Sequence, residues 1–332
     1  MENAMRDLVR DFYRQVNIAE NTPFYFPSNF DVSHINKVLA CGLGGSGIGA
    51  KLLASMVSAD LKMPFEVCHD YDIPSYTDAR TLVIISSYSG NTEETLEAMH
   101  KAHQSGASLV CITSGGAVAD YARTHDLALA LMPAGFPPRS QMGISVSLQV
   151  IMLSQLGLIG AGHLAGLRAG ADFIRDHAGA IQEQAARLAA FFHGLVPLLY
   201  ADAHREPVLI RWQQQLNENS KVLCHHHVFP EMNHNELVGW EGADSRFAAL
   251  LMRTAQDHPR TSYRMDICSP LFKKKCDRVQ EVVFSHADAW VNAWHMIHLG
   301  DWISVLLADL NQVDATEIKT IIYLKDQLSR LK

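Results

Sequence analysis

The sequence predicts an α/β protein that begins with a doubly wound parallel sheet, and two observations support this. Short apolar runs alternate with helix-forming stretches through the first 132 residues. The runs are continuously apolar instead of alternating, as expected when helices cover both faces of a parallel sheet. The expected strands are 37–42, 64–69, 81–86, 108–113 and 126–132, and the expected helices between them are 47–58, 93–105 and 117–125.

The rest of the chain predicts a second, less regular α/β half. A lead-in helix is expected within 1–25, and 142–199 is Ala-rich and almost wholly helical in pattern, with a break at 160–162. Further strands are expected near 208–211, 247–252, 262–267 and 281–284, and further helices over 288–310 and 314–331. A chain of 332 residues exceeds what one core usually serves. We therefore expect two domains, 1–155 and 156–332, joined by long helices.

Composition excludes several classes of protein. The formal net charge is −7 and the densest basic run is Lys273-Lys274-Lys275, so we expect no nucleic-acid partner. The first residues lack an apolar signal segment, and the longest apolar stretch, 144–159, is interrupted by polar residues and too short for a bilayer. The six cysteines form no Cys-x-x-Cys pair. These features predict a cytoplasmic protein with reduced thiols and no membrane association.

A glycine-rich loop, 42–49, follows the first apolar strand and opens a helix. Glycines let the backbone approach an anion closely, and the helix N-terminus offers unpaired N–H groups. The pattern also satisfies G-x-G-x-x-G, and Glu66 or Asp70 lies about where a ribose-binding acid would be. A dinucleotide-dependent oxidoreductase is therefore an alternative that rests on this loop.

A second loop, 86–95, is rich in hydroxyl groups and also lies between a buried strand and a helix. Its serines, threonines and glycine suit a phosphate monoester, because hydroxyls add donors to the backbone N–H groups. The alternative is that Thr92 only caps the helix, which requires a single hydroxyl. Both loops are expected at the carboxyl ends of parallel strands, where ligands bind in such sheets.

Three further segments carry groups able to move protons or stabilise charge. Arg139 follows the fifth expected strand, Glu218 lies in the amide-rich segment 213–221, and His234 lies between two asparagines. Aldose–ketose isomerisation needs a base to carry a proton between C1 and C2, a group that opens the sugar ring, and positive charge near the enediolate. Taken singly, each residue has another explanation: a surface ion pair, a helix-end charge and a turn residue. Together with the two loops they favour one active site.

These motifs carry a resemblance to a known family. Gly-Gly-Ser-Gly at 44–47 and Ser-x-Ser-Gly-x-Thr-x-Glu at 87–94 resemble the SIS (sugar isomerase) domain. With Asn-Glu-Asn-Ser-Lys at 217–221 and Pro-Glu-x-Asn-His-Asn-Glu at 230–236, nearly the whole chain is similar to the bifunctional phosphoglucose/phosphomannose isomerases. The resemblance implies two flavodoxin-like SIS subdomains. It also implies a metal-independent isomerase that interconverts glucose 6-phosphate, and mannose 6-phosphate, with fructose 6-phosphate.

The resemblance also implies roles for individual residues. Glu218 would be the enediol base, His234 the ring-opening group and Arg139 the enediolate stabiliser, while Lys325 matches a lysine on a helix that closes the site. His234 would reach the site of a neighbouring subunit, so a homodimer with shared active sites is expected. The expected ligands of the sugar phosphate are Gly44, Gly45, Ser46, Ser87, Ser89 and Thr92.

Two other features have simpler interpretations. Cys224-His225-His226-His227 could suggest zinc, but adjacent histidines point in different directions and structural zinc sites space their ligands, so we expect no metal and no cofactor. Trp290, Trp294 and Trp302 recur at helical spacing, which favours a buried helix face or a dimer interface. A phosphosugar-binding module without catalysis remains an alternative function. Glu218, His234 and Arg139 argue against it.

Overall fold

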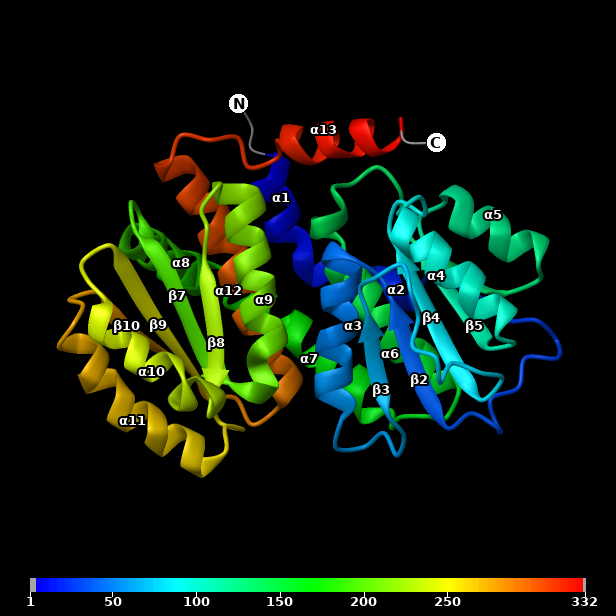
Figure 1. The fold of residues 1–332 in the computed structure, drawn as a ribbon, viewed down its shortest axis with the longest axis horizontal. Coiled ribbons are helices and arrows are strands. Elements are labelled where there is room, and N and C mark those ends of the chain that lie inside the picture. The colour runs from blue at the N-terminus through cyan, green and yellow to red at the C-terminus, as the bar shows by residue number, and fades with distance from the viewer. Residues whose placement is uncertain (1–3, 331–332) are drawn as a thin grey trace.

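The computed structural model describes residues 4–330, which form two mostly parallel sheets separated by helices (Figure 1). The first sheet has the order β1-β6-β5-β4-β2-β3, and β1 alone runs antiparallel to its neighbour. With β2 counted as the first strand, β2 to β6 have the order 2-1-3-4-5 of flavodoxin-like folds. The strands are β1 (Phe24–Tyr25), β2 (Lys37–Cys41), β3 (Phe65–Cys68), β4 (Thr81–Ser87), β5 (Ser108–Thr113) and β6 (Ala128–Leu131).

The first half matches the expected elements closely, except that β1, which pairs with β6, lies in a range where only the lead-in helix was expected. Helices α3 (Gly44–Val57), α4 (Glu93–Gln104) and α5 (Gly116–Thr124) follow β2, β4 and β5. Strand β2 pairs in parallel with both β3 and β4. The order of the strands therefore reverses between β2 and β4, and the loops that leave these two strands flank the crevice where ligands bind in open α/β sheets.

The second sheet has the order β10-β9-β7-β8 and is wholly parallel. It repeats the first four strands of the flavodoxin-like order, so the predicted pair of related α/β halves is confirmed. Its strands are β7 (Val196–Asp202), β8 (His225–Phe229), β9 (Phe247–Thr254) and β10 (Val279–Phe284), and its helices are α9 (Glu206–Gln215), α10 (Glu236–Gly239), α11 (Pro259–Lys273) and α12 (Ala289–Leu310).

Several expected elements of this half are wrong. The segments 208–211 and 262–267 are not strands but parts of α9 and α11, each of which begins with a proline in its first turn. Short apolar runs do not distinguish a buried helix turn from a strand. Strand β7 lies where the helical pattern was expected to continue to residue 199, and β8 was missed because three histidines occupy its start.

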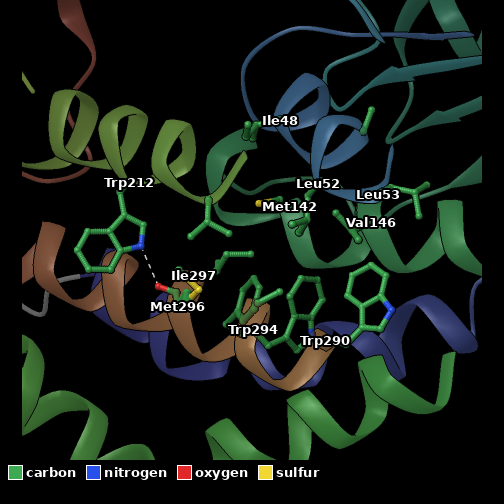
Figure 2. Close-up of a cluster of buried hydrophobic side chains, with 14 of the residues drawn as sticks. Ile48, Leu52, Leu53, Met142, Val146, Trp212, Trp290, Trp294, Met296 and Ile297 are labelled. Carbon is green, nitrogen blue, oxygen red and sulfur yellow. Dashed lines mark hydrogen bonds between the residues drawn. The ribbon is translucent and has the colours of Figure 1, made fainter. Parts of the chain in front are cut away.

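Four helices between the sheets join the two halves through one core. They are α6 (Met142–Gln155), α7 (Gly162–Asp176), α8 (Ala178–Phe192) and α12, and apolar side chains of α3 and α6 meet those of α12 there (Figure 2). Trp290 and Trp294 are buried, as predicted for a core-facing stripe. They lie so close to Gly166 and Gly170 of α7 that any larger residue would clash.

The N-terminal segment of the described chain also contacts this helical layer. The lead-in forms α1 (Ala4–Arg10), η1 (Asp11–Arg14) and α2 (Gln15–Glu20), and Phe12 packs edge-on against Trp294 at 5.5 Å between ring centroids. The division into 1–155 and 156–332 therefore stays a prediction, since residues from both ranges share one core.

Helix α13 (Lys319–Leu328) begins later than expected, and residue 331 lies outside the described range. No helix within residues 4–330 is long and apolar enough to cross a bilayer.

Candidate active site

The two sheets point in opposite directions on either side of the helical layer. The first turn of α3 lies against Arg139, whereas Ser55 near its end donates a hydrogen bond to the carbonyl of His204, just before α9 (2.8 Å). Helices α3 and α9 therefore run antiparallel (Figure 1). As a result, the carboxyl edge of the first sheet and the carboxyl end of α9 meet at the same side of the molecule.

The glycine loop is packed against both of the other active-site segments of the first half. A Cβ atom on Gly42 would lie 2.6 Å from the carbonyl oxygen of Ser86, and one on Gly45 would lie 3.2 Å from that of Pro138. Gly44 has φ +53°. A left-handed backbone favours glycine at Gly44, and the close approach to the end of β4 requires it at Gly42. Ser46 follows in the first turn of α3 and is nearly buried.

The hydroxyl-rich loop places Ser87 and Thr92 side by side. Ser87 Oγ donates a hydrogen bond to Thr92 Oγ1 at 3.2 Å, and Ser87 is buried while Ser89 is exposed. Thr92 precedes α4 but its side chain makes no capping hydrogen bond to the helix. The alternative of a simple cap is therefore wrong. The first turn of α4 keeps backbone N–H groups that an anion can use.

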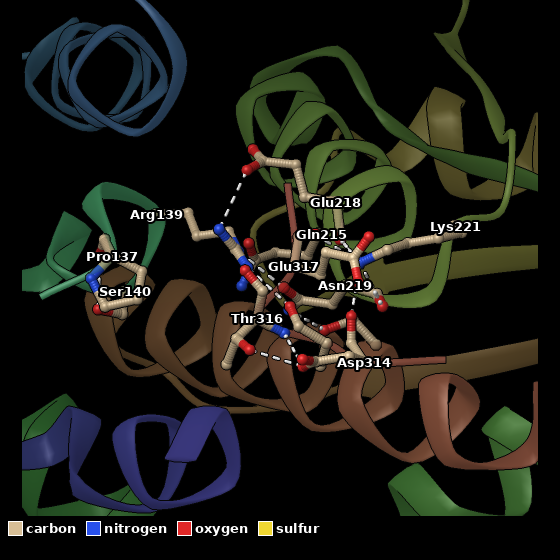
Figure 3. Close-up of polar contacts among 12 residues, drawn as sticks. Pro137, Arg139, Ser140, Gln215, Glu218, Asn219, Lys221, Asp314, Thr316 and Glu317 are labelled. Atoms are coloured by element: carbon tan, nitrogen blue, oxygen red, sulfur yellow. Dashed lines mark hydrogen bonds and ion pairs between the residues drawn. The ribbon is translucent and has the colours of Figure 1, made fainter. Parts of the chain in front are cut away.

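Arg139 is buried in the short 3₁₀ turn η2 (Pro138–Ser140), with 3% of its surface exposed. Its Nε donates to Asn219 Oδ1 at 2.7 Å, Nη2 donates to the carbonyl of Ala315 at 2.7 Å, and Nη1 lies 3.3 Å from Glu218 Oε2 (Figure 3). Burial lowers the pKa of the Arg139 guanidinium, and the Glu218 carboxylate opposes that effect. Arginine keeps its charge over the whole physiological range, so the turn holds a fixed positive charge beside a carboxylate.

A residue of the lead-in helix fixes the Arg139 turn. Gln15 is buried, its Nε2 donates to the carbonyl of Ser140 at 2.7 Å, and its Oε1 accepts from the N–H of Ile144 at 3.1 Å. One side chain thus satisfies the backbone on both sides of the junction between η2 and α6.

Glu218 lies in η4, a π-helical turn (Leu216–Ser220) that continues α9. The turn is fixed to α12, because Asn219 Nδ2 donates to Ser304 Oγ (2.9 Å) and Ser220 Oγ donates to the Ser304 carbonyl (2.6 Å). The Glu218 side chain is 28% exposed. π-Helical turns occur frequently at functional sites, and this one points the carboxylate toward Arg139.

Lys221 and the segment 314–317 are parts of the site that the sequence did not single out. Lys221 Nζ lies within hydrogen-bonding distance of four carbonyl oxygens, those of Glu218 (2.6 Å), Asp314 (2.7 Å), Glu317 (2.9 Å) and Asn219 (3.5 Å). Burial lowers the pKa of Lys221, and the charge of Arg139 adds to this effect. The side chains of Arg139 and Lys221 thereby hold the segment 314–317 in place (Figure 3). Lys221 is the last residue of the Asn-Glu-Asn-Ser-Lys motif, which was the available signal.

The chain does not bring His234 or Lys325 to Glu218. Glu218 precedes β8, whereas His234 lies in η5 (Glu231–His234) beyond the end of that strand, whose five residues span about 13 Å. Figure 1 shows α10 at the arrowhead of β8, away from the end of α9. His234 is exposed, and among residues 4–330 it has no hydrogen-bond or ionic partner. Lys325 is exposed on α13, none of whose residues is buried.

The features behind the alternative interpretations have other partners. In the Cys224–His227 segment, His225 contacts Glu236 and His226 contacts Gln213, while no cluster suited to a metal exists in the part of the chain that is described. Glu66 accepts a hydrogen bond from Tyr76, and Asp70 accepts one from the backbone of Tyr71. Each of these two acids thus has a hydrogen-bond partner within ten residues of the chain.

Family models match both halves of the chain. The model described as SIS domain matches residues 32–158, and the model described as bacterial phospho-glucose isomerase C-terminal SIS domain matches residues 181–328. The C-terminal domain of glucosamine-fructose-6-phosphate aminotransferase from Francisella tularensis has a similar fold, with a TM-score of 0.76 at 14% identity, over 96% of this chain and 99% of that one.

Curated relatives match over most of their length. The bifunctional phosphoglucose/phosphomannose isomerase of Caldicellulosiruptor bescii is 35% identical over 92% of this chain and 93% of its own. The protein of the same name from Aquifex aeolicus is 30% identical over 90% of this chain and 92% of its own. The fold, the two loops and these matches agree, and the chain belongs to the bifunctional phosphoglucose/phosphomannose isomerase family.

Proposed function

We propose that this protein interconverts glucose 6-phosphate and mannose 6-phosphate with fructose 6-phosphate through an enediol. The observation that carries the proposal is the placement of Glu218 and Arg139. They form an ion pair. The glycine loop packs on one side against the turn that carries Arg139 and on the other against Ser86, where the hydroxyl-rich loop begins. A six-carbon sugar phosphate held at one end by its phosphate would present C1 and C2 to a base and a fixed positive charge.

Each group has a distinct role in this mechanism. Ser87, Ser89 and Thr92, with the N-terminus of α4, bind the phosphate, while Ser46 and the backbone of Gly44 and Gly45 face the sugar. The carboxylate of Glu218 removes a proton from one carbon of the open-chain sugar and returns it to the neighbouring carbon. Arg139 stabilises the negative charge of the enediolate.

The remaining roles require a second subunit. We propose a two-fold dimer in which His234 opens the sugar ring in the site of the partner. Two observations support this. The histidine is exposed, and strand β8 separates it from Glu218 of the same chain. Exposed apolar side chains on α13, including Ile322, Tyr323 and Leu324, favour burial of this helix against another surface, where Lys325 would approach a site. We propose a cytoplasmic enzyme with no nucleic-acid or membrane partner.

An isomerase assay tests the function directly. The purified protein is given fructose 6-phosphate, and glucose 6-phosphate and mannose 6-phosphate are measured separately with linked dehydrogenases. We expect both products. Tight binding of fructose 6-phosphate with neither product formed would instead indicate a phosphosugar-binding module.

Loss of a hydroxyl at the phosphate site should weaken substrate binding. Ser87→Ala and Thr92→Ala each remove a donor to a dianionic phosphate, a charge-assisted hydrogen bond worth about 1.5–3 kcal/mol. We expect KM to rise about tenfold or more in steady-state assays, since each 1.4 kcal/mol corresponds to a factor of ten. Inorganic phosphate should compete with the substrate of the parent enzyme.

Ser105→Ala is the matched control for these two variants. Ser105 lies at the opposite end of α4, where its hydroxyl donates to the carbonyl of Ala102 at 2.8 Å. Its KM should equal that of the parent. An unchanged KM in both Ser87→Ala and Thr92→Ala would show that the phosphate binds elsewhere.

A further inference from the structure

The segment that carries His234 is anchored on both sides of the histidine. Before it, Asn233 Oδ1 accepts a hydrogen bond from Arg264 Nη1 at 3.2 Å. After it, Asn235 Oδ1 accepts from the N–H of Glu236 at 2.5 Å and caps α10. The segment thus presents one free imidazole from a backbone that its neighbours hold in place.

Glu236 makes the strongest of these attachments. Its Oε1 accepts a hydrogen bond from the hydroxyl of Tyr200 at 2.5 Å, and its Oε2 lies 2.8 Å from His225 Nε2. Trp240 Nε1 donates to the same tyrosine oxygen at 3.2 Å. Tyr200 belongs to β7 and His225 to β8. One carboxylate therefore fastens the His234 segment to two neighbouring strands of the second sheet.

The surroundings of this carboxylate are largely apolar. Tyr200 is fully buried, and Trp240 stacks on Phe272 with 4.0 Å between ring centroids. Burial alone would raise the pKa of Glu236, but the hydrogen bonds from His225 and Tyr200 outweigh it, and the pKa lies below its ordinary value. The hydrogen bond with Glu236 raises the pKa of His225. The carboxylate is therefore ionised near neutral pH and both partners act as donors to it.

Stability alone does not account for this arrangement. A partly exposed ion pair such as that of Glu236 and His225 contributes little to stability, whereas the directional hydrogen bonds that Glu236 accepts fix one arrangement of the backbone. Here the fixed backbone is that of residues 231–236, and the side chain left free is the proposed ring-opening group.

We infer that Glu236, held by Tyr200 and His225, is a positioning residue that sets the direction in which His234 projects toward the partner's site. The inference rests on the proposed role of His234. General acid–base catalysis depends on hydrogen-bonding distance to the reacting atom, so a small displacement of the imidazole lowers turnover while substrate binding persists. Glu236 itself touches no substrate.

The test measures kcat, KM and melting temperature for Glu236→Gln and Tyr200→Phe. Each substitution keeps side-chain size and weakens the network. We expect kcat to fall about tenfold or more with KM within about twofold of the parent, because the phosphate site lies in the other half of the chain. Each substitution is then combined with His234→Ala. The double variants should be no slower than His234→Ala alone, which a merely structural role would not produce.

Glu281→Gln is the matched control. Glu281 lies on β10, at the opposite edge of the same sheet, and accepts a hydrogen bond from Arg253 Nε at 2.8 Å. Its side chain is 29% exposed, compared with 21% for Glu236. This variant should retain the parent kcat.

The outcomes separate the inference from the function on which it rests. Parent-like kcat in both single variants, or an additive loss in the double variants, would overturn the positioning role while leaving the isomerase intact. Parent-like activity in His234→Ala itself would remove the proposed ring-opening role, and the inference with it.

Discussion

Glu218→Gln is expected to lower turnover at least about 100-fold, which is the order of a lost general base. Glutamine has the same size as glutamate, and its carbonyl oxygen can still accept the hydrogen bond from Arg139 Nη1. The position of the guanidinium should therefore be kept, and only the ability to take a proton from carbon is removed. The measurement is kcat with fructose 6-phosphate and with glucose 6-phosphate.

A binding measurement distinguishes loss of the catalytic base from disruption of the whole substrate site. The dissociation constant for fructose 6-phosphate, measured by calorimetry, should change little, because the proposed phosphate ligands lie between β4 and α4 of the first half. Glu183→Gln, which changes an exposed carboxylate on α8, should behave as the parent in both measurements. Near-normal turnover of Glu218→Gln would exclude Glu218 as the base.

Mixing two inactive variants is expected to restore about a quarter of the parent activity. If each site takes Glu218 from one chain and His234 from the other, homodimers of Glu218→Gln and of His234→Ala are both defective. In a mixed dimer, one site collects both substitutions and the other has both native residues. Random re-association of equal amounts makes half of the dimers mixed, and half of their sites work.

The mixing experiment depends on subunit exchange, which differently tagged chains can demonstrate by co-purification. Each variant mixed with itself provides the baseline. Activity that stays at this baseline despite proven exchange would place His234 in its own subunit's site or outside catalysis. A monomeric protein with full activity would exclude the shared site altogether.

Local patterns sufficed for the first half of the fold. Continuous apolar runs marked β2 to β6 within two residues at each end, since the central strands of the sheet are covered on both faces. The glycine and hydroxyl-rich loops were identified for the same reason, because each lies between a strand and a helix whose patterns are plain. Even there, the alternative of a cap at Thr92 competed with the predicted ligand role, and only the structure shows that the Thr92 side chain makes no cap and instead accepts a hydrogen bond from Ser87.

The second half was less predictable because its elements depend on distant partners. Val208 to Arg211 form part of a helix since Pro207 starts it and Trp212 packs against α12, where its indole donates to the Met296 carbonyl at 2.8 Å (Figure 2). The histidines of β8 lack an apolar signal, and the strand forms through its ladder with β7. In both cases, contacts between residues far apart in the sequence override local preference.

By itself, the sequence determined the fold class, the family and the residue types of the site. Each of these depends on neighbours within a few residues along the chain. Only the tertiary structure decided which of those residues meet. Arg139 and Glu218 come together because α3 and α9 pack antiparallel, and Lys221 ties the C-terminal segment over them. His234 is kept apart because β8, a nearly straight strand, separates it from Glu218 and cannot fold back on itself.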